Sequence, residues 1–448
     1  MRTNAYLHVP LAERARDTFP RTEVATVSSP PPAASPPPTS ASPASTSSTT
    51  VVKRTKSRTW VVAVVAVVIL VIAGLAVGYE EKWFGGSSTT KPLAACGGDY
   101  TLQGNGAQIA LPLMNQWETN FSAQTTNLVN YPAAGSGTGI TDFSEHPPLI
   151  DFAVTDDPLT ASENAALPGA ALTLPMTAGA IILIYNLPGL TGHLDLTGNV
   201  TAGIYLGTIT NWNSSAIAAL NPGVNLPNQP ILTVHREDAA GTTYVLTDFL
   251  SADNATWAAG PGKGISISWP DSGGEPHQVA PKGNSAVITE VQTTPYTIGY
   301  SDLTDVLAAS SPIQYAEVQN PKGNFVVPTL ASAASAITDK LATVTLPAAS
   351  DTSGWYNVSM VNAPGATDYP LATFIFLFVY KAVDQGYEPS VEKAQVLVQW
   401  LNWVVTTGQT LSTYNGLNYV ALPSTVVAID QAGIQSMTFN GAAIPSCS

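Results

Sequence analysis

Short apolar runs and amphipathic segments alternate along the chain from residue 99 onward. Apolar runs bounded by Gly, Pro, Asn or Asp predict strands. These runs lie at 100–103, 127–131, 149–154, 180–185, 230–234, 297–300 and 371–380. Apolar residues at helical spacing predict helices, which lie at 111–121, 244–250, 286–292, 393–405 and 426–434. This alternation is typical of an α/β domain.

Small and polar residues follow four of the predicted strands in tight turns. The turns lie at 104–109, 135–140, 155–158 and 235–243. In open α/β sheets, ligands bind beyond the carboxyl ends of the strands, where such turns gather. These four turns together are therefore the candidate ligand site.

The turn at 235–243 carries the strongest chemical signal. It joins a strand to a helix, and the first turn of a helix offers unpaired N–H groups and a positive dipole end to an anion. Arg236 is the only arginine after Arg58, and its guanidinium can hold an oxyanion through two parallel hydrogen bonds. The stretch alone also permits an ordinary strand–helix junction with a surface Arg–Asp pair.

The N-terminal part differs in composition from the rest. Residues 1–58 are rich in Pro, Ser, Thr and Ala, which predicts a disordered tail. The uncharged apolar stretch 60–78 would span roughly 28 Å as a helix, the thickness of a bilayer core, and lies within a predicted helix at 59–79. Basic residues precede it, which predicts one transmembrane helix with a cytoplasmic N-terminus, a linker at 80–95 and an extracellular domain. Two alternatives stay open: a cleaved signal peptide, and a lipoprotein cleavage box at 93–96.

Charge and cysteine usage exclude some classes of function. The net charge is −14, and eight of the 17 Lys and Arg residues precede Trp60, so the predicted domain is strongly acidic. Nucleic-acid binding is not expected, because it needs a basic face. Cys96 and Cys447 lie near the two ends of the domain and form either a disulfide or two unpaired thiols. Two Cys and five scattered His lack metal-ligand spacing, so neither a metal site nor a cofactor is expected.

An ordered set of short motifs carries a resemblance to a known family. The motifs are Gly-Asn-Gly-Ala at 104–107, Gly-Ser-Gly-Thr-Gly at 135–139, Asp-Phe-Ala-Val-Thr-Asp at 151–156, Asn-Leu-Pro-Gly at 186–189, Arg-Glu-Asp-Ala-Ala-Gly-Thr at 236–242 and Ile-Gly-Tyr at 298–300. Over roughly residues 98–440 the chain resembles the phosphate-binding proteins of ABC-type phosphate importers, the PstS family. The resemblance implies a hinged periplasmic-binding-protein fold of type II. One lobe would comprise 96–185 and 369–448, and the other 186–368.

The resemblance also implies a ligand, inorganic phosphate, and the residues that hold it. Those residues are Gln108, Ile109, Ser136, Asp156, Arg236, Asp238, Ala240, Gly241 and Thr242. Arg236, held by Asp238, would give charge-assisted hydrogen bonds, and Ser136, Gly241 and Thr242 would donate from helix starts. Asp156 would accept a proton of phosphate, whereas sulfate has no proton to give at neutral pH and would be repelled.

Two positions depart from the family pattern. The first loop usually has Thr-Phe, where this chain has Gln108 and Ile109. The backbone N–H of Ile109 could still donate to the ligand, and the side-chain amide of Gln108 could replace the hydroxyl. The residue before Gly241 is usually Ser, where this chain has Ala240. One hydroxyl donor is therefore lost, a change worth roughly 1–3 kcal/mol if nothing replaces it.

These observations predict a membrane-anchored extracellular receptor that captures phosphate and delivers it to the permease subunits of an ABC transporter. It is expected to be a monomer. An enzyme is not expected, because no nucleophile–base pair or metal cluster is evident and His235 has no evident partner. The alternative keeps the fold but makes the protein an oxyanion sensor, a scavenger or a cell-surface interaction protein, and a phosphatase is a more distant one.

Overall fold

A computed structural model describes residues 92–270, 277–385, 389–411 and 417–447. The predicted tail at 1–58, the predicted transmembrane helix at 59–79 and most of the predicted linker lie outside these residues. Within the described ranges, no helix is both long and apolar enough to cross a membrane.

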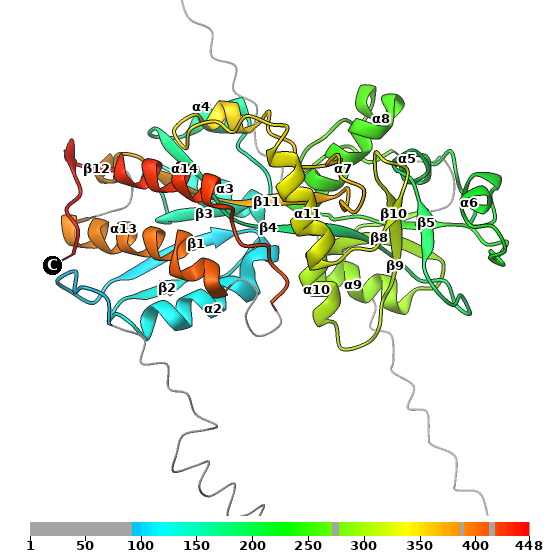
Figure 1. Ribbon diagram of the computed structural model, residues 1–448, viewed down its shortest axis with the longest axis horizontal. Coiled ribbons are helices and arrows are strands. Elements are labelled where there is room, and N and C mark those ends of the chain that lie inside the picture. Colours follow the sequence, from blue (N-terminus) through cyan, green and yellow to red (C-terminus); the bar gives the residue numbers. More distant parts are fainter. Residues whose placement is uncertain (1–91, 271–276, 386–388, 412–416, 448) are drawn as a thin grey trace, which may run out of the picture. The chain divides into compact units, whose positions relative to one another are not determined.

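The described residues form an α/β fold around one large mixed sheet, which confirms the predicted α/β class (Figure 1). The strands are β1 Thr101–Gly106, β2 Leu128–Asn130, β3 Phe152–Thr155, β4 Ala171–Tyr185, β5 Leu194–Leu196, β6 Leu232–Val234, β7 Gln278–Val279, β8 Thr297–Asp302, β9 Gln314–Gln319, β10 Phe325–Val326, β11 Ala372–Tyr380, β12 Thr438–Phe439 and β13 Ala442–Ala443. The main strand order is β2-β1-β3-β11-β4-β8-β6-β7, with β9, β5 and β10 joined beside β4.

Helices follow most strands and cover the sheet (Figure 1). They are α2 Leu111–Ser122, α3 Ser136–Ser144, α4 Ala161–Ala166, α5 Gly198–Tyr205, α6 Ser215–Leu220, α7 Gly241–Asp253, α8 Ala255–Ala259, α9 Asn284–Thr293, α10 Leu303–Ala308, α11 Leu330–Leu341, α12 Thr352–Trp355, α13 Val391–Val405 and α14 Ser424–Gln435. Three short 3-10 helices are η1 Gln108–Ala110, η2 Val383–Gln385 and η3 Thr407–Leu411.

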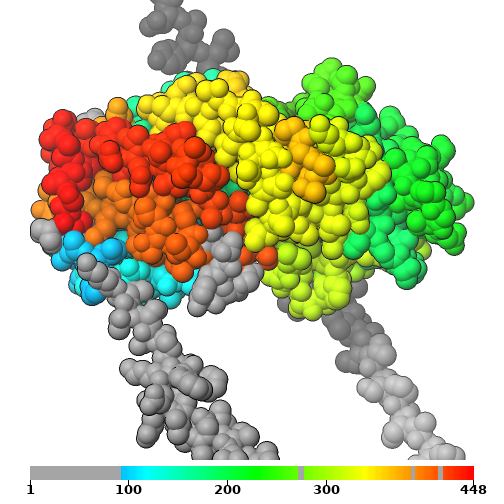
Figure 2. Space-filling view, in the orientation of Figure 1, coloured from blue at the N-terminus to red at the C-terminus, as the bar shows by residue number. Residues whose placement is uncertain are grey.

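The sheet has two halves, which we call the β1 half and the β8 half. The β1 half contains the parallel strands β2, β1 and β3, with α2, α3, α13 and α14. The β8 half contains the parallel strands β8, β6 and β7, with α5, α7, α9 and α10. The chain around α11, yellow in Figure 2, lies on the side of the molecule toward the viewer, and α11 packs against β4 and β11.

Strand β4 links the two halves and is longer than the sequence predicts. Its residues up to Ala180 pair with β11, and those from Ile181 pair with β8. The predicted run at 180–185 covers only its last part, because Pro175 and Gly179 are poor strand residues. The register with β11 shifts next to Pro175, so an irregularity accommodates a residue that cannot donate to the ladder.

Large aromatic side chains fix the helical layer over the β1 half. Trp117 of α2 and Trp400 of α13 are fully buried with ring centroids 6.3 Å apart in an edge-on arrangement. Phe121 lies 5.1 Å from the Trp400 ring. Their helical spacing reflects core packing, since edge-to-face pairs add stability beyond the area they bury.

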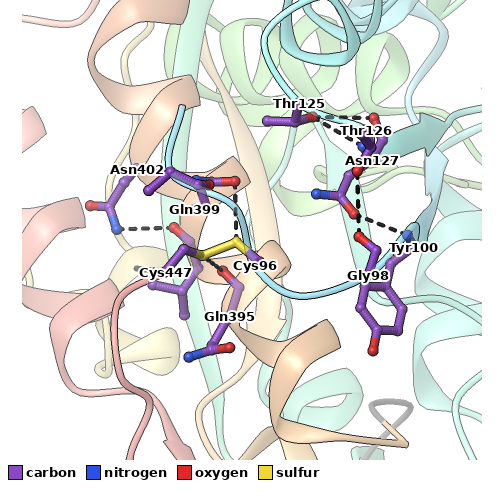
Figure 3. The surroundings of a disulfide bond; sticks show 12 residues. Cys96, Gly98, Tyr100, Thr125, Thr126, Asn127, Gln395, Gln399, Asn402 and Cys447 are labelled. Atoms are coloured by element: carbon purple, nitrogen blue, oxygen red, sulfur yellow. Dashed lines mark hydrogen bonds between the residues drawn. A yellow bond between two sulfur atoms is a disulfide. The ribbon is translucent and has the colours of Figure 1, made fainter. Parts of the chain in front are cut away.

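A disulfide joins Cys96 to Cys447 beside α13, as Figure 3 shows. The Cα atoms are 4.6 Å apart although 351 positions separate the residues in sequence. The amide of Gln399 on α13 donates to the carbonyl of Ala94 at 2.8 Å, which holds the incoming chain at the same place. The bond therefore ties the two ends of the folded domain together.

We expect the double variant Cys96→Ala with Cys447→Ala to unfold at a lower temperature than the wild type. Its free energy of unfolding should be lower by about 2–4 kcal/mol. The disulfide closes a loop that contains nearly the whole domain, so its loss releases the unfolded chain. Calorimetry of both proteins measures the change. Cys96 precedes β1 and Gln108 follows it, so the disulfide and the candidate site lie at opposite ends of this strand and anion affinity should be unchanged. A variant as stable as the wild type would contradict the expectation.

Candidate functional site

The predicted site residues lie where strands end and helices begin. Ser136 is the first residue of α3, after Gly135, whose φ of 110° suits only glycine. Gly241 is the first residue of α7. Gln108 begins η1 directly beyond β1, and Asp156 follows β3. The loops of the two halves therefore meet at one place, as strand-end turns were predicted to do.

The helices that begin at the site lack side-chain caps of their own. The N-cap residues of α3, α7 and α9 are Gly135, Ala240 and Gly283, and none gives a side-chain hydrogen bond. Most other described helices are capped by their own N-cap residue, among them α5 by Thr197 and α13 by Ser390. Uncapped first-turn N–H groups are the donors with which helix N-termini bind anions.

Ser136 connects the two halves and orients Asp156. The Ser136 hydroxyl donates to Asp156 Oδ1 at 3.1 Å and accepts from the N–H of Gly241 at 3.2 Å. Only glycine fits at 241, since an added Cβ would lie 2.1 Å from Asp156 Oδ1. The N–H of Gly137 also donates across the junction, to the carbonyl of Ala239 at 3.3 Å.

Asp156 presents one carboxylate oxygen with no protein partner. Its Oδ2 is buried and has no hydrogen-bond partner within the described part of the chain. Burial raises the pKa of Asp156 to about 6, against the opposing effects of the Ser136 hydrogen bond and the Arg236 charge. This oxygen can therefore accept a hydrogen bond from a ligand that carries a proton.

Arg236 is buried, and its guanidinium donates to the side chains of Asp238, Asn284 and Thr242. Its Nε donates to Asp238 Oδ1 at 2.7 Å, and its Nη2 donates to Asp238 Oδ2, which completes a bidentate pair. Burial raises the pKa of Asp238, but the hydrogen bonds and charge of Arg236 outweigh this and hold the pKa below its usual value. The Arg236 backbone N–H donates to the Tyr300 hydroxyl at 3.1 Å, so main chain and side chain are both fixed.

Asn284 belongs to this network and was missed by the sequence reasoning. Its Oδ1 accepts from Arg236 Nη1, and its Nδ2 donates to Asp302 Oδ2 at 2.5 Å and Asp305 Oδ2 at 3.3 Å. Burial raises the pKa of Asp302 well above its usual value. The available signal was a Gly-Asn pair just before the predicted helix 286–292, similar to Gly-Ser at 135–136 but too common to single out.

Three predicted ligand residues lie at the site with roles that differ from one another. Thr242 is buried and its Oγ1 accepts from Arg236 Nη1 at 3.4 Å. The N–H of Ala240 donates to the carbonyl of Ile265 at 2.9 Å, so this residue has neither a hydroxyl nor a free backbone donor. Ile109 is buried, and its carbonyl accepts from the Tyr419 hydroxyl at 2.5 Å.

Gln108 reaches across to the other half. Its Oε1 accepts from the backbone N–H of Asn284, the first residue of α9, at 2.8 Å. The prediction was that the side-chain amide could replace a hydroxyl as a donor to the ligand. In the structure the carbonyl oxygen of this amide bonds a helix of the β8 half.

His235, next to Arg236, is fully engaged. Its Nδ1 lies 3.1 Å from the carbonyl of Arg236, and its Nε2 lies 3.1 Å from Gln278 Oε1. Its ring stacks on Trp269 with centroids 4.5 Å apart, and burial lowers its pKa. Among the described residues, no cluster of His, Cys, Asp or Glu has metal-site geometry.

Comparison with known proteins identifies the family that this geometry belongs to. A family profile described as a PBP superfamily domain matches residues 44–407. The phosphate-binding protein PstS of Xylella fastidiosa (strain 9a5c) is 34% identical over 349 residues, which cover 76% of this chain and 87% of the relative. The chain belongs to the PstS family of phosphate-binding proteins. PstS of Pasteurella multocida (strain Pm70) is 33% identical over 333 residues, which cover 74% of this chain and 89% of that PstS.

A solved structure of a phosphate-binding protein shares the fold. The phosphate-binding protein from Stenotrophomonas maltophilia superposes with a TM-score of 0.56 at 18% identity, covering 74% of this chain and 93% of that one. The two sequence relatives, which align over about three quarters of the chain, confirm the resemblance to the PstS family carried by the short motifs.

Proposed function

We propose that this protein captures inorganic phosphate between the β1 half and the β8 half and delivers it to the permease of an ABC transporter. The observation that carries the proposal is that one buried site combines groups that favour an anion with a group that favours a proton. A fixed guanidinium, Arg236, and uncapped helix N-termini favour an anion, while the free Oδ2 of Asp156 requires that the anion carry a proton.

Phosphate near neutral pH meets both requirements, because it is a tetrahedral anion that still carries at least one proton. Arg236 and first-turn N–H groups of α3 and α7 other than those of Gly137 and Gly241 would donate to its oxygens, and Asp156 Oδ2 would accept its P–OH proton. Sulfate lacks that proton and would meet the carboxylate lone pairs directly. Ala240 would contribute less than the family pattern implies, since it has no hydroxyl and its N–H donates to Ile265.

Capture would proceed by closure of two lobes, 96–185 with 369–448 against 186–368. Hydrogen bonds that cross between the halves, such as Gly241 to Ser136 and Asn284 to Gln108, support closure. A ligand that bridges the halves shifts the open–closed equilibrium by its differential affinity for the closed state.

The proposed location is the outer face of a cell membrane, with 59–79 as a transmembrane anchor and 1–58 in the cytoplasm. The Cys96–Cys447 disulfide supports an oxidising, extracytoplasmic compartment for the domain. The proposed partners are the permease subunits in the same membrane, and the protein would act as a monomer.

Binding without chemistry is the proposed mode of action. A hydrolytic enzyme would need an activated nucleophile, but His235, the base closest in sequence to Arg236, has both ring nitrogens engaged. The Ser136 hydroxyl is committed to Asp156 and Gly241. The relatives reported above are likewise named as binding proteins.

Titration calorimetry of the full chain, stripped of bound anion, tests the proposal. We expect saturable binding of one phosphate per chain at pH 7 and no heat with sulfate. Absence of phosphate binding by the folded protein would overturn the proposed function.

A further inference from the structure

The side chain of Gln108, which lies in the β1 half, forms a hydrogen bond with the β8 half. It begins η1 in the β1 half, and its Oε1 accepts from the N–H of Asn284 at 2.8 Å, 176 positions along the chain. Gly283, the N-cap of α9, has a φ of 85°, and an added Cβ there would lie 3.1 Å from Gln108 Nε2. The close approach therefore needs a glycine at 283 and a long amide at 108.

This contact supplies α9 with a cap that the helix lacks. A helix leaves its first N–H groups without intrahelical partners, and a side chain of the preceding residue usually satisfies one. Gly283 has no side chain, so α9 has no cap from its own segment. The amide orientation of Gln108 follows, because a backbone donor must meet the carbonyl oxygen of the side chain and not its NH₂ group.

The capped residue is also the one that supports the ligand-binding arginine. Asn284 Oδ1 accepts from Arg236 Nη1, while the N–H of Gly283 donates to Asp238 Oδ1 at 3.1 Å. The Gly283–Asn284 pair is thus held by the Arg236–Asp238 pair on one side and by Gln108 on the other. A shift of the α9 start would move the acceptor that orients the guanidinium.

We propose that Gln108 is a positioning residue that caps α9 from the opposite half only when the halves are together, and so holds Asn284 and Arg236 in place and slows phosphate release. The inference rests on the proposed function. It gives the departure from the family's first loop a specific role, since a Thr side chain is too short to make the same reach.

The contact forms on closure, so its loss affects release more than capture. For Gln108→Met, which keeps the length but has no acceptor, we expect the phosphate release rate to rise about tenfold, equivalent to about 1.4 kcal/mol. The association rate should stay within about twofold. The unfolding temperature without phosphate should not change, whereas a merely structural role would lower it.

Stopped-flow release and association of phosphate by full-length wild type and Gln108→Met provide the measurement. Gln103→Met is the matched control, because the Gln103 side chain bonds Asn130 within the β1 half, at 2.8 Å, and should leave both rates unchanged. Hydrogen exchange in the phosphate-bound state gives a direct readout, since the Asn284 amide should exchange faster in Gln108→Met. An unchanged release rate, or an unchanged Asn284 exchange rate, overturns the inference.

A double-mutant cycle tests the link to Arg236. Asn284→Ala keeps the capped N–H but removes the oxygen that accepts from Arg236. If Gln108 acts through Asn284, Gln108→Met should accelerate release less in the Asn284→Ala background than in the wild type. Equal acceleration in both backgrounds overturns the positioning role. Failure of the wild type to bind phosphate would instead mean that the proposed function is wrong.

Discussion

Replacing Arg236 with alanine should lower phosphate affinity by at least about a thousandfold. The substitution removes the buried guanidinium and leaves the Asp238 carboxylate, whose side chain is only 15% exposed, without its partner and close to the anion. The guanidinium would make charge-assisted hydrogen bonds to phosphate, each worth about 1.5–3 kcal/mol, and each 1.4 kcal/mol is a factor of ten in affinity. Repulsion between the unpaired Asp238 carboxylate and the bound anion adds to this loss.

Titration calorimetry of Arg236→Ala against wild type measures the loss. Arg236→Lys keeps the charge but cannot pair with Asp238 in two places and also reach Asn284, so we expect about a hundredfold loss. Removing the carboxylate as well, in Arg236→Ala with Asp238→Ala, should recover part of the affinity, because the unpaired charge is gone. The control is Lys322→Ala, an exposed cation in the turn between β9 and β10.

Binding by Arg236→Ala within tenfold of the wild type would mean that helix N-termini alone hold the anion. No recovery in the double variant would mean that the repulsion from Asp238 is not the cause of the loss. Circular dichroism of each variant confirms that the fold is retained, since Tyr300 anchors the backbone of residue 236 independently of its side chain.

The centre of this site was predictable because its signals are local. A strand, a small-residue turn and a helix with one arginine in the turn identify 230–250 without knowledge of the fold. Periodicity likewise predicted strands at 149–154 and 371–380 and helices at 111–121 and 393–405. The structure has β3, β11, α2 and α13 at these positions.

The parts that sequence reasoning missed depend on contacts between distant segments. The first part of β4 contains Pro175 and Gly179, and it is a strand only because β11 and a change of register accommodate it. Helix α11 was not predicted, although Leu330, Ile337 and Leu341 recur at helical spacing, because the residues between the first two are all alanine or serine. The Gln108–Asn284 contact arises only when two halves meet, so no spacing in the sequence reports it.

Asp156→Asn should turn a phosphate site into one that also accepts sulfate. The substitution preserves shape, and the Ser136 hydroxyl, which donates to Oδ1, fixes the orientation of the new amide. The amide oxygen must stay toward Ser136, so the NH₂ group takes the place of the unpartnered Oδ2. An acceptor that faces the ligand thus becomes a donor.

The expected change in phosphate affinity is a loss of about ten- to a hundredfold, because a charge-assisted hydrogen bond is worth about 1.5–3 kcal/mol. Sulfate, which the wild type should not bind detectably at pH 7, should bind the variant with an affinity close to that of phosphate. Calorimetry with each anion measures both effects. Asp99→Asn, a change at an exposed carboxylate before β1, is the control and should leave selectivity unaltered.

The same reasoning predicts that acid opens the wild-type site to sulfate. Burial raises the pKa of Asp156 to about 6 in the protein without ligand, so the carboxyl gains a proton as the pH falls through about 6. The protonated carboxyl can donate to sulfate as the asparagine amide does. Wild-type affinity for sulfate should therefore rise from pH 7 to pH 5, while that of Asp156→Asn should change little. If the wild type rejects sulfate equally at both pH values, or if Asp156→Asn still rejects it, discrimination does not depend on the proton at Asp156.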